Sequence, residues 1–185
     1  MGGKDDSAED SVITFRCTKR VRDLLGLTDR DLDDETEGEL YEWFVEMATI
    51  ERYRCLLFTH KLSLYSFWAV AVRKPDLLAF DELFQHHAVA MLKGDGYSDV
   101  EISRLLPRPG HRFAKTNSRP VTGSMNDHVK NSRWYFEHDG GIRVADARAI
   151  NRQLNRTPMG ALAPGSHMDF PIDVLMRILR PSGAG

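Results

Sequence analysis

The sequence predicts a single α+β domain built on a mainly antiparallel, four-stranded sheet that helices cover on one or both faces. Its 185 residues, of which 42% are hydrophobic and 28% charged, suit one globular domain with a sizeable core. Short segments rich in β-branched and aromatic residues alternate with segments of helical periodicity, as expected for this class. The predicted strands lie near residues 11–17, 52–59, 62–72 and 110–115.

Composition divides the chain into three parts. Residues 1–10 carry four acids and three Gly or Ser residues with almost nothing to bury, so a disordered leader is expected there. Residues 11–156 contain the periodic apolar segments and form the predicted α+β domain. Residues 157–185 form a Pro- and Gly-rich tail in which only Ile172–Leu179 is apolar enough for a short helix.

The domain is predicted to begin with a strand and a short helix. Val12–Cys17 is rich in β-branched residues, and Thr18 is a suitable cap for a helix that ends at Gly26. Between about Thr36 and Thr49, four apolar residues recur at helical spacing, which predicts a helix packed on the sheet. These residues are Leu40, Trp43, Phe44 and Met47.

The next two β-rich runs predict an antiparallel hairpin at the centre of the sheet. The runs cover residues 52–59 and 62–72, and only His60 and Lys61 separate them, which indicates a tight turn. A helix is predicted over residues 75–94, because a Pro opens the segment, apolar residues follow at helical spacing and Gly residues close it.

The second half of the domain is predicted to contain shorter elements. Ser98 and Glu101 match a capping box, which indicates that a short helix follows. The fourth strand is expected at residues 111–115, and a helix is expected to begin at Ser124 and end near Glu137, before a pair of glycines. A weaker helical pattern covers residues 144–154.

Charge is distributed unevenly, although the net charge is only −2. Residues 1–51 hold 15 Asp or Glu against six Lys or Arg, whereas residues 104–133 hold seven Lys or Arg against a single Asp. The basic stretch is therefore expected to produce a local positive field that attracts phosphate. The alternative is that it pairs with the acidic first third of the chain across the fold.

The chain is expected to be a cytoplasmic protein that neither enters a membrane nor is exported. No window approaches the roughly 18 consecutive apolar residues of a membrane-spanning helix, and the first residues lack the apolar stretch of a secretion signal. The two cysteines, Cys17 and Cys55, are too few for a disulfide scaffold and lie among apolar residues. We expect both to be buried, reduced thiols.

The segment from His111 to His128 is unusually dense in side chains that recognise ligands. If the helix starts near Ser124, the backbone N–H groups of residues 123–125 are free to bind a phosphate. Glycine there lets a ligand approach closely, while amides, hydroxyls and guanidinium groups recognise nucleotide and phosphate oxygens. The candidate ligand-binding residues are Arg16, Lys19, Arg112, Lys115, Thr116, Asn117, Arg119, Gly123, Ser124 and Asn126.

This candidate site depends on the arrangement of residues in space. Arg16 and Lys19 join it only if the first strand lies beside the fourth, and every functional version requires Arg112, Lys115 and Arg119 to converge. The alternative is that the polar residues of the segment satisfy turns and a helix cap, as these residue types often do.

Familiar catalytic and nucleotide-binding motifs are missing from the sequence. It contains neither the phosphate-loop pattern nor Gly-x-Gly-x-x-Gly, and it has no Gly-x-Ser-x-Gly elbow for a serine nucleophile. His86 and His87 are adjacent on the predicted helix, so they do not have the spacing of a helical metal pair. We therefore expect no metal and no cofactor.

Five short segments have distinctive sequences: Phe15–Lys19, Cys55–Thr59, Leu64–Ser66, Phe113–Arg119 and Gly123–Asp127. Together they resemble the signature of an uncharacterised family of bacterial proteins, the domain of unknown function DUF6933. The resemblance covers roughly residues 12–137 and implies that these segments belong to one shared architecture. It implies no activity, substrate or catalytic residue. The loop differs from the family pattern at Ser118 and Pro120.

Three functions remain compatible with these residues. The first is a binding module for a phosphate-bearing ligand, with nucleic acid, particularly RNA, ahead of a free nucleotide. The second is a metal-independent, ribonuclease-like enzyme or toxin that uses His111, Lys115 and His128 as acid/base and charge-stabilising groups. The third is a protein-interaction subunit, antitoxin-like or part of an assembly, whose acidic first third meets a basic partner and whose exposed aromatics, among Trp134–Phe136, form an interface or pack in a homodimer.

Overall fold

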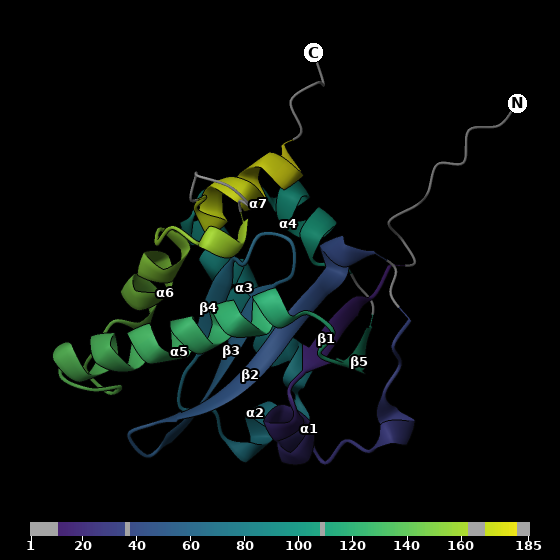
Figure 1. Cartoon of the computed structure of the whole chain (residues 1–185), viewed down its shortest axis with the longest axis horizontal. Helices are drawn as coiled ribbons and strands as arrows, with labels where there is room; N and C mark the ends of the chain where they lie inside the picture. The colour runs from purple at the N-terminus through teal and green to yellow at the C-terminus, as the bar shows by residue number, and fades with distance from the viewer. Residues whose placement is uncertain (1–10, 36–37, 108–109, 163–168, 181–185) are drawn as a thin grey trace, which may run out of the picture.

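The computed structural model describes residues 11–35, 38–107, 110–162 and 169–180 and has an α+β fold, in which helices cover both faces of one sheet (Figure 1). The strands are β1 (Ile13–Cys17), β2 (Glu42–Ile50), β3 (Tyr53–His60), β4 (Ser66–Ala69) and β5 (His111–Lys115). The helices are α1 (Lys19–Leu25), α2 (Lys74–Leu78), α3 (Phe80–Gly94), α4 (Asp99–Leu105), α5 (Arg119–His138), α6 (Ala147–Asn155) and α7 (Pro171–Leu179). Residues 1–10 lie outside the described residues, so the disordered leader stays a prediction.

The sheet has five strands in the order β4-β3-β2-β1-β5 and is mixed. The strands β2, β3 and β4 form an antiparallel meander, whereas β1 runs parallel to both β2 and β5. The predicted α+β class is therefore correct. The prediction of four mainly antiparallel strands is wrong, because the sheet has five strands and two of its four pairings are parallel.

The additional strand is β2, where the sequence predicts a helix. Most residues of Glu42–Ile50 are buried, because helices cover the sheet on both sides. A strand buried on both faces carries an almost continuous apolar run, and such a run also satisfies helical spacing. Periodicity therefore could not distinguish the two structures.

The predicted hairpin exists as β3 and β4, but its turn is longer than His60-Lys61. The strand β3 continues through His60, which is fully buried. The Nδ1 atom of His60 lies 2.8 Å from the hydroxyl of Ser63, and its Nε2 lies 3.0 Å from the carbonyl oxygen of Leu40. These contacts shape the longer loop, and β2 occupies the centre of the sheet.

Each face of the sheet carries its own core. On the first face, Phe15 and Phe58 pack with residues of α1, α3, α4 and α7. On the second face, Leu57 and Trp68 pack with residues of α5 and α6. The helix α7, from the predicted tail, thus belongs to the first core and extends the folded region to Leu179. No helix among the described residues is long and apolar enough to cross a membrane.

The helix α5 begins at Arg119, not at Ser124 as predicted. Ser118 caps it, since its hydroxyl oxygen accepts the N–H of Val121 at 3.4 Å, and Pro120 is compatible with the first helical turn. Apart from the segment that forms β2, the other predicted helices are present, although the segment 75–94 is divided into α2 and α3 at Ala79. The Ser98 capping box of α4 is confirmed.

Candidate functional site

The carboxyl ends of β1 and β5 lie side by side, because the two strands are parallel and Cys17 pairs with Lys115. From β1 the chain enters α1, whose Val21 packs in the first core. From β5 it enters α5, whose Val121 packs in the second core on the opposite face. In open α/β sheets, ligands bind where the connections of neighbouring parallel strands diverge in this way.

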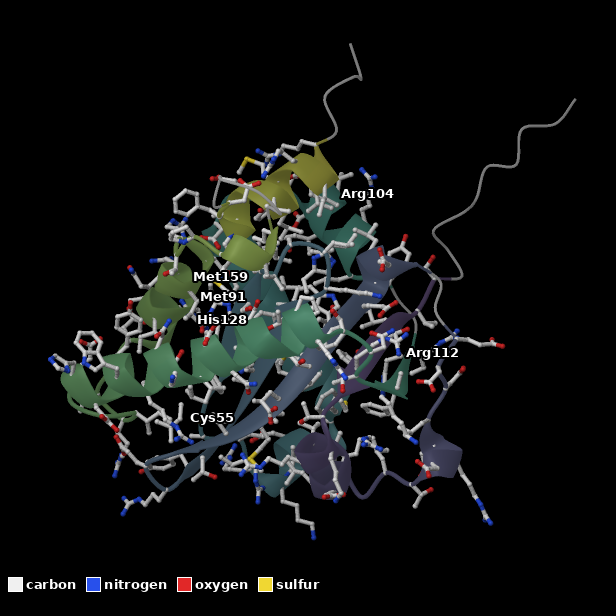
Figure 2. The ribbon with its side chains drawn as sticks, viewed as in Figure 1. Cys55, Met91, Arg104, Arg112, His128 and Met159 are labelled. Atoms are coloured by element: carbon white, nitrogen blue, oxygen red, sulfur yellow. The ribbon has the colours of Figure 1, made fainter. Side chains whose placement is uncertain are left out.

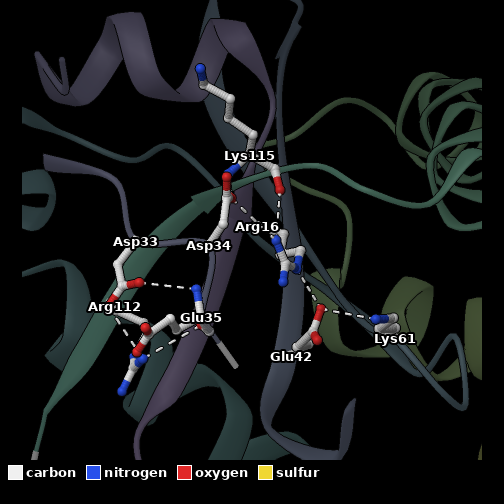
Figure 3. A network of polar contacts seen from close by, with 8 residues as sticks. All are labelled: Arg16, Asp33, Asp34, Glu35, Glu42, Lys61, Arg112 and Lys115. Carbon is white, nitrogen blue, oxygen red and sulfur yellow. Dashed lines mark hydrogen bonds and ion pairs between the residues drawn. The ribbon is translucent and has the colours of Figure 1, made fainter. Parts of the chain in front are cut away.

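Arg16 lies at this position and is almost completely buried, with 2% of its surface exposed. Its Nε donates to the carboxylate of Glu42, and one terminal nitrogen donates to the carbonyl oxygen of Lys115 at 3.0 Å (Figure 3). The same nitrogen lies 3.6 Å from the carboxylate of Asp34. The side-chain amide of Asn117 faces Arg16. In the orientation that satisfies both its oxygen and its nitrogen, the oxygen accepts hydrogen bonds from two nitrogens of Arg16, each at 3.2 Å. The guanidinium group therefore ties β1, β2 and β5 together.

The partner of Arg16, Glu42, is fully buried and contacts a second cation. The Lys61 ammonium lies 3.1 Å from the Glu42 carboxylate and 3.0 Å from that of Glu39. Removing a carboxylate from water is costly unless cations and hydrogen bonds compensate it, and here two cations do so. Such buried charged clusters occur often at functional sites. We call Arg16, Asp34, Glu42, Lys61, Lys115 and Asn117 the strand-end cluster.

The acidic segment, residues 29–35, lies against β5. It is held by the backbone, because the N–H of Asp33 donates to the carbonyl oxygen of Phe113 at 2.7 Å. Its carboxylates contact the cations of β5: Asp29 lies 2.8 Å from Lys115 Nζ, and Asp33 lies 3.2 Å from Arg112. The hydrogen bond from Lys115 lowers the pKa of Asp29. The alternative that basic residues pair with the acidic first third of the chain is thus confirmed for these cations.

Arg112, Lys115 and Arg119 do not converge on a single point. Side chains alternate along a strand, so Arg112 and Lys115 point to opposite faces of β5, and Figure 3 shows them directed away from each other. Arg119 is exposed in the first turn of α5. Lys19 is also exposed and pairs with Asp23 at 2.7 Å. The structure instead brings Arg16, the Lys115 carbonyl and Asn117 together.

A comparison with models of protein families identifies the family of this chain. The model of the family described as "Domain of unknown function (DUF6933)" matches residues 14–174. The chain belongs to the DUF6933 family. No curated protein and no solved structure matches the chain. The matched residues include the complete strand-end cluster and the acidic segment of this DUF6933 domain.

The predicted anion cradle at residues 123–125 is not present in the DUF6933 domain. These residues lie inside α5, so their N–H groups bond to carbonyl groups of the preceding turn. Ser124 is buried and donates its hydroxyl to the carbonyl oxygen of Pro120 at 3.0 Å. Gly123 and Asn126 are exposed on the outer side of the helix, and Thr116 is half-buried in the connection before it.

The two candidate catalytic histidines of the DUF6933 domain lie apart. His111 begins β5 while Lys115 ends it, a separation of about 13 Å along a strand. His128 is buried on the inner side of α5, well separated from Arg112 of β5 in Figure 2. Burial lowers the pKa of His128 to about 4. Its Nε2 has no hydrogen-bond partner among the described residues.

Two pockets lie near charged groups. A pocket of about 230 Å³ beside the strand-end cluster is lined by Lys61, Glu39 and Ser118 at the start of α5. An open pocket of about 450 Å³ is lined by residues following β4 and by the half-buried His87 and exposed His86 of α3. Within the ranges that the structure describes, no group of three His, Cys, Asp or Glu side chains is arranged to hold a metal ion.

Sequence reasoning missed the acidic half of the strand-end cluster. Glu42 lies in the segment that the sequence predicts as a helix, and Asp34 is only one of the 15 acids counted in residues 1–51. Lys61 was assigned to a tight turn. The signal that pointed toward these residues was the excess of acids in residues 1–51 opposite the excess of cations in residues 104–133.

Proposed function

We propose that this DUF6933 domain binds a phosphate-bearing ligand, and that the ligand is nucleic acid, RNA in particular, rather than a free nucleotide. One observation carries the proposal. At the carboxyl ends of β1 and β5, Lys115 and Arg16 already hold two carboxylates of the same chain, those of Asp29 and Asp34. Each of these two cations holds a carboxylate and therefore has the charge and the hydrogen-bond donors to hold a phosphate oxygen.

The acidic segment is suited to exchange with a ligand. Asp29 and Asp34 have side chains that are 80% and 70% exposed, and exposed ion pairs contribute little to stability. A polyanion, by contrast, gains from releasing its condensed counterions at each contact. In this proposal, phosphates replace the carboxylates of the acidic segment, while the buried Glu42 keeps Arg16 in place.

Binding has stronger support than catalysis. A ribonuclease-like mechanism needs a general acid and a general base within hydrogen-bond reach of one phosphodiester. The separation of His111 and Lys115, and the burial of His128 beneath α5, provide no such pair. The proposal therefore assigns recognition of RNA to this chain, without cleavage.

The test is binding of a labelled single-stranded RNA across a series of salt concentrations. Affinity should fall steeply with salt, and Lys115→Ala should weaken binding and reduce the slope of log K against log salt by about 0.7, the effect of one lost phosphate contact. Lys93→Ala is a matched control, because Lys93 also forms an exposed pair, with Asp99 at 2.9 Å. Absence of binding by the folded wild-type protein at low salt would disprove the proposed function.

A further inference from the structure

The outer side of α5 carries an exposed stripe of polar and aromatic residues. The helix has 20 residues, and its inner side, which includes Val121, Met125 and Phe136, is buried against the sheet. Residues three, four or seven positions apart share a face of a helix. The members of the outer stripe are Arg119, Gly123, Asn126, Lys130, Arg133 and Trp134, all exposed.

The cations of the outer stripe differ from those of β5. Arg112 and Lys115 are paired with acids, but among the described residues neither Arg119 nor Lys130 forms an ion pair. Arg133 donates to a backbone carbonyl oxygen, that of Thr49, at 3.3 Å and so keeps its charge uncompensated by an acid. The acids exposed on α5 are Asp127 and Glu137, which lie three and seven positions from Lys130 and so share its face. Among the described residues neither acid forms an ion pair with a cation of the stripe, so these cations can still pair with a partner.

Trp134 is the one indole among the three tryptophans that faces solvent. It is 55% exposed, whereas Trp43 and Trp68 are buried in the two cores. Its ring stacks on His138, with centroids 4.1 Å apart and planes at 26°, and the ring of Tyr135 lies nearly perpendicular to it. The indole is thus held in a fixed orientation at the surface beside Arg133 and Lys130, an arrangement that suits base stacking.

The geometry of α5 suits an extended strand. At 1.5 Å per residue, the stripe from Arg119 to Trp134 is about 22 Å long, enough for several nucleotides. At Gly123 an added Cβ would meet nothing within 4 Å, so the surface is open between the two groups of cations. A ligand can therefore approach the helix closely at this point of the stripe.

We propose that the outer stripe of α5 binds single-stranded RNA, with phosphates on Arg119, Lys130 and Arg133 and a base stacked on Trp134. The inference rests on the proposed function and makes it more specific, because stacking requires an unpaired base whose face is accessible. Lys115 and Arg119 are separated along the chain by a connection of only three residues, so the outer stripe begins close in sequence to the strand-end cluster.

Tryptophan fluorescence provides the first test. Because Trp43 and Trp68 are buried, quenching on binding reports on Trp134. The wild-type protein is titrated with a ten-nucleotide single-stranded RNA, with its duplex and with inorganic polyphosphate. We expect quenching and the tightest binding with the single strand, weaker binding with the duplex, and binding without quenching with polyphosphate.

Variants of Trp134 provide the second test. Trp134→Ala should weaken single-strand binding about 5- to 100-fold and leave polyphosphate binding unchanged, whereas Trp134→Phe should retain most of the affinity. Leu78→Ala, which removes another large exposed side chain, is the control and should bind like the wild type. Thermal unfolding of all variants checks that each is folded.

The outcomes separate the two proposals. If Trp134→Ala binds single-stranded RNA as tightly as the wild type, or if the wild type binds duplex as tightly as single strand, the outer stripe is not the binding surface. Binding that depends on Lys115 would in that case still support the proposed function. If the wild type binds neither RNA nor polyphosphate, both proposals fail. Self-association of the wild type that Trp134→Ala abolishes, without RNA binding, would identify the stripe as a homodimer interface instead.

Discussion

Asn155 binds the backbone of Ser66 with both ends of its side-chain amide. Its Oδ1 accepts the Ser66 N–H at 2.7 Å, and its Nδ2 donates to the Ser66 carbonyl oxygen at 2.8 Å. One helical turn earlier, Asn151 makes the same pair of contacts with Trp68, at 2.8 and 3.4 Å. Alternate residues of a strand direct their backbone groups to the same side. Two amides of α6 therefore occupy the outer edge of β4, where another strand would pair.

Asn155→Ala is expected to destabilise the fold by about 2–4 kcal/mol, because the N–H and carbonyl group of Ser66 lose their partners in a buried place. Urea unfolding measures the change in the free energy of unfolding. Asn131→Ala, on the exposed side of α5, is the control and should change this free energy by less than about 0.5 kcal/mol. Equal effects of the two substitutions would contradict the role of Asn155.

Neutralising the acidic segment is expected to strengthen RNA binding. The combined variant Asp29→Asn and Asp34→Asn removes two carboxylates that occupy Lys115 and Arg16, and it also removes their repulsion of phosphate. We expect affinity for single-stranded RNA to rise at least threefold at low salt, as measured by fluorescence anisotropy. Asp23→Asn, which removes an exposed acid paired with Lys19, is the matched control. Unchanged or weaker binding by the combined variant would show that these acids do not compete with the ligand.

Acid is expected to destabilise the protein through two buried histidines. Burial lowers the pKa of His60 and of His128 to about 4 each, while an unfolded histidine titrates near 6.5. Between these values the unfolded chain binds more protons than the folded protein, so stability is complete above about pH 6.5 and falls as the pH decreases toward 4. Each histidine contributes roughly 3 kcal/mol to this loss at most.

His128→Leu is expected to reduce this pH dependence. The free energy of unfolding is measured in urea at pH 7, 6 and 5 for both proteins. The value for the wild type minus the value for the variant should decrease as the pH falls, because only the wild type loses stability through His128. Carboxylates such as Asp29 and Glu101, whose pKa values are lowered, are present in both proteins and cancel in the comparison. A difference that does not change with pH would mean that His128 does not titrate as its burial implies.

Gly141→Ala is expected to destabilise the connection between α5 and α6. Gly141 has a φ of +91°, and a Cβ there would lie only 2.4 Å from the carboxylate of Glu51, which accepts the N–H of Ile142 at 2.9 Å. Strain and loss of this contact should cost about 2–3 kcal/mol and lower the Tm by roughly 4–12 °C. Gly160→Ala is the control, because a Cβ at Gly160 meets nothing within 4 Å. Equal melting temperatures for Gly141→Ala and the wild type would contradict the prediction.

Half of the strand-end cluster follows from the sequence. Arg16, Lys115 and Asn117 were identified as chemically suited to bind a ligand, and the parallel pairing of β1 with β5 brings them together. Their acidic partners, Glu42 and Asp34, were not identified. Arg16 and Glu42 are 26 positions apart, and no local pattern indicates that two such charges meet in a buried place.

Local signals were sufficient where structure depends on neighbouring residues: the short helix α1 between Thr18 and Gly26, the Ser98 capping box of α4 and the strand β5 all follow from the sequence by itself. The tertiary structure alone decided that Glu42–Ile50 is a strand, because burial on both faces depends on helices distant in the chain. It also decided which cations are paired, since Lys115 and Arg112 contact the acidic segment because the fold places that segment against β5. Capping and turn preferences act over a few residues, whereas burial and ion pairing depend on which distant segments meet.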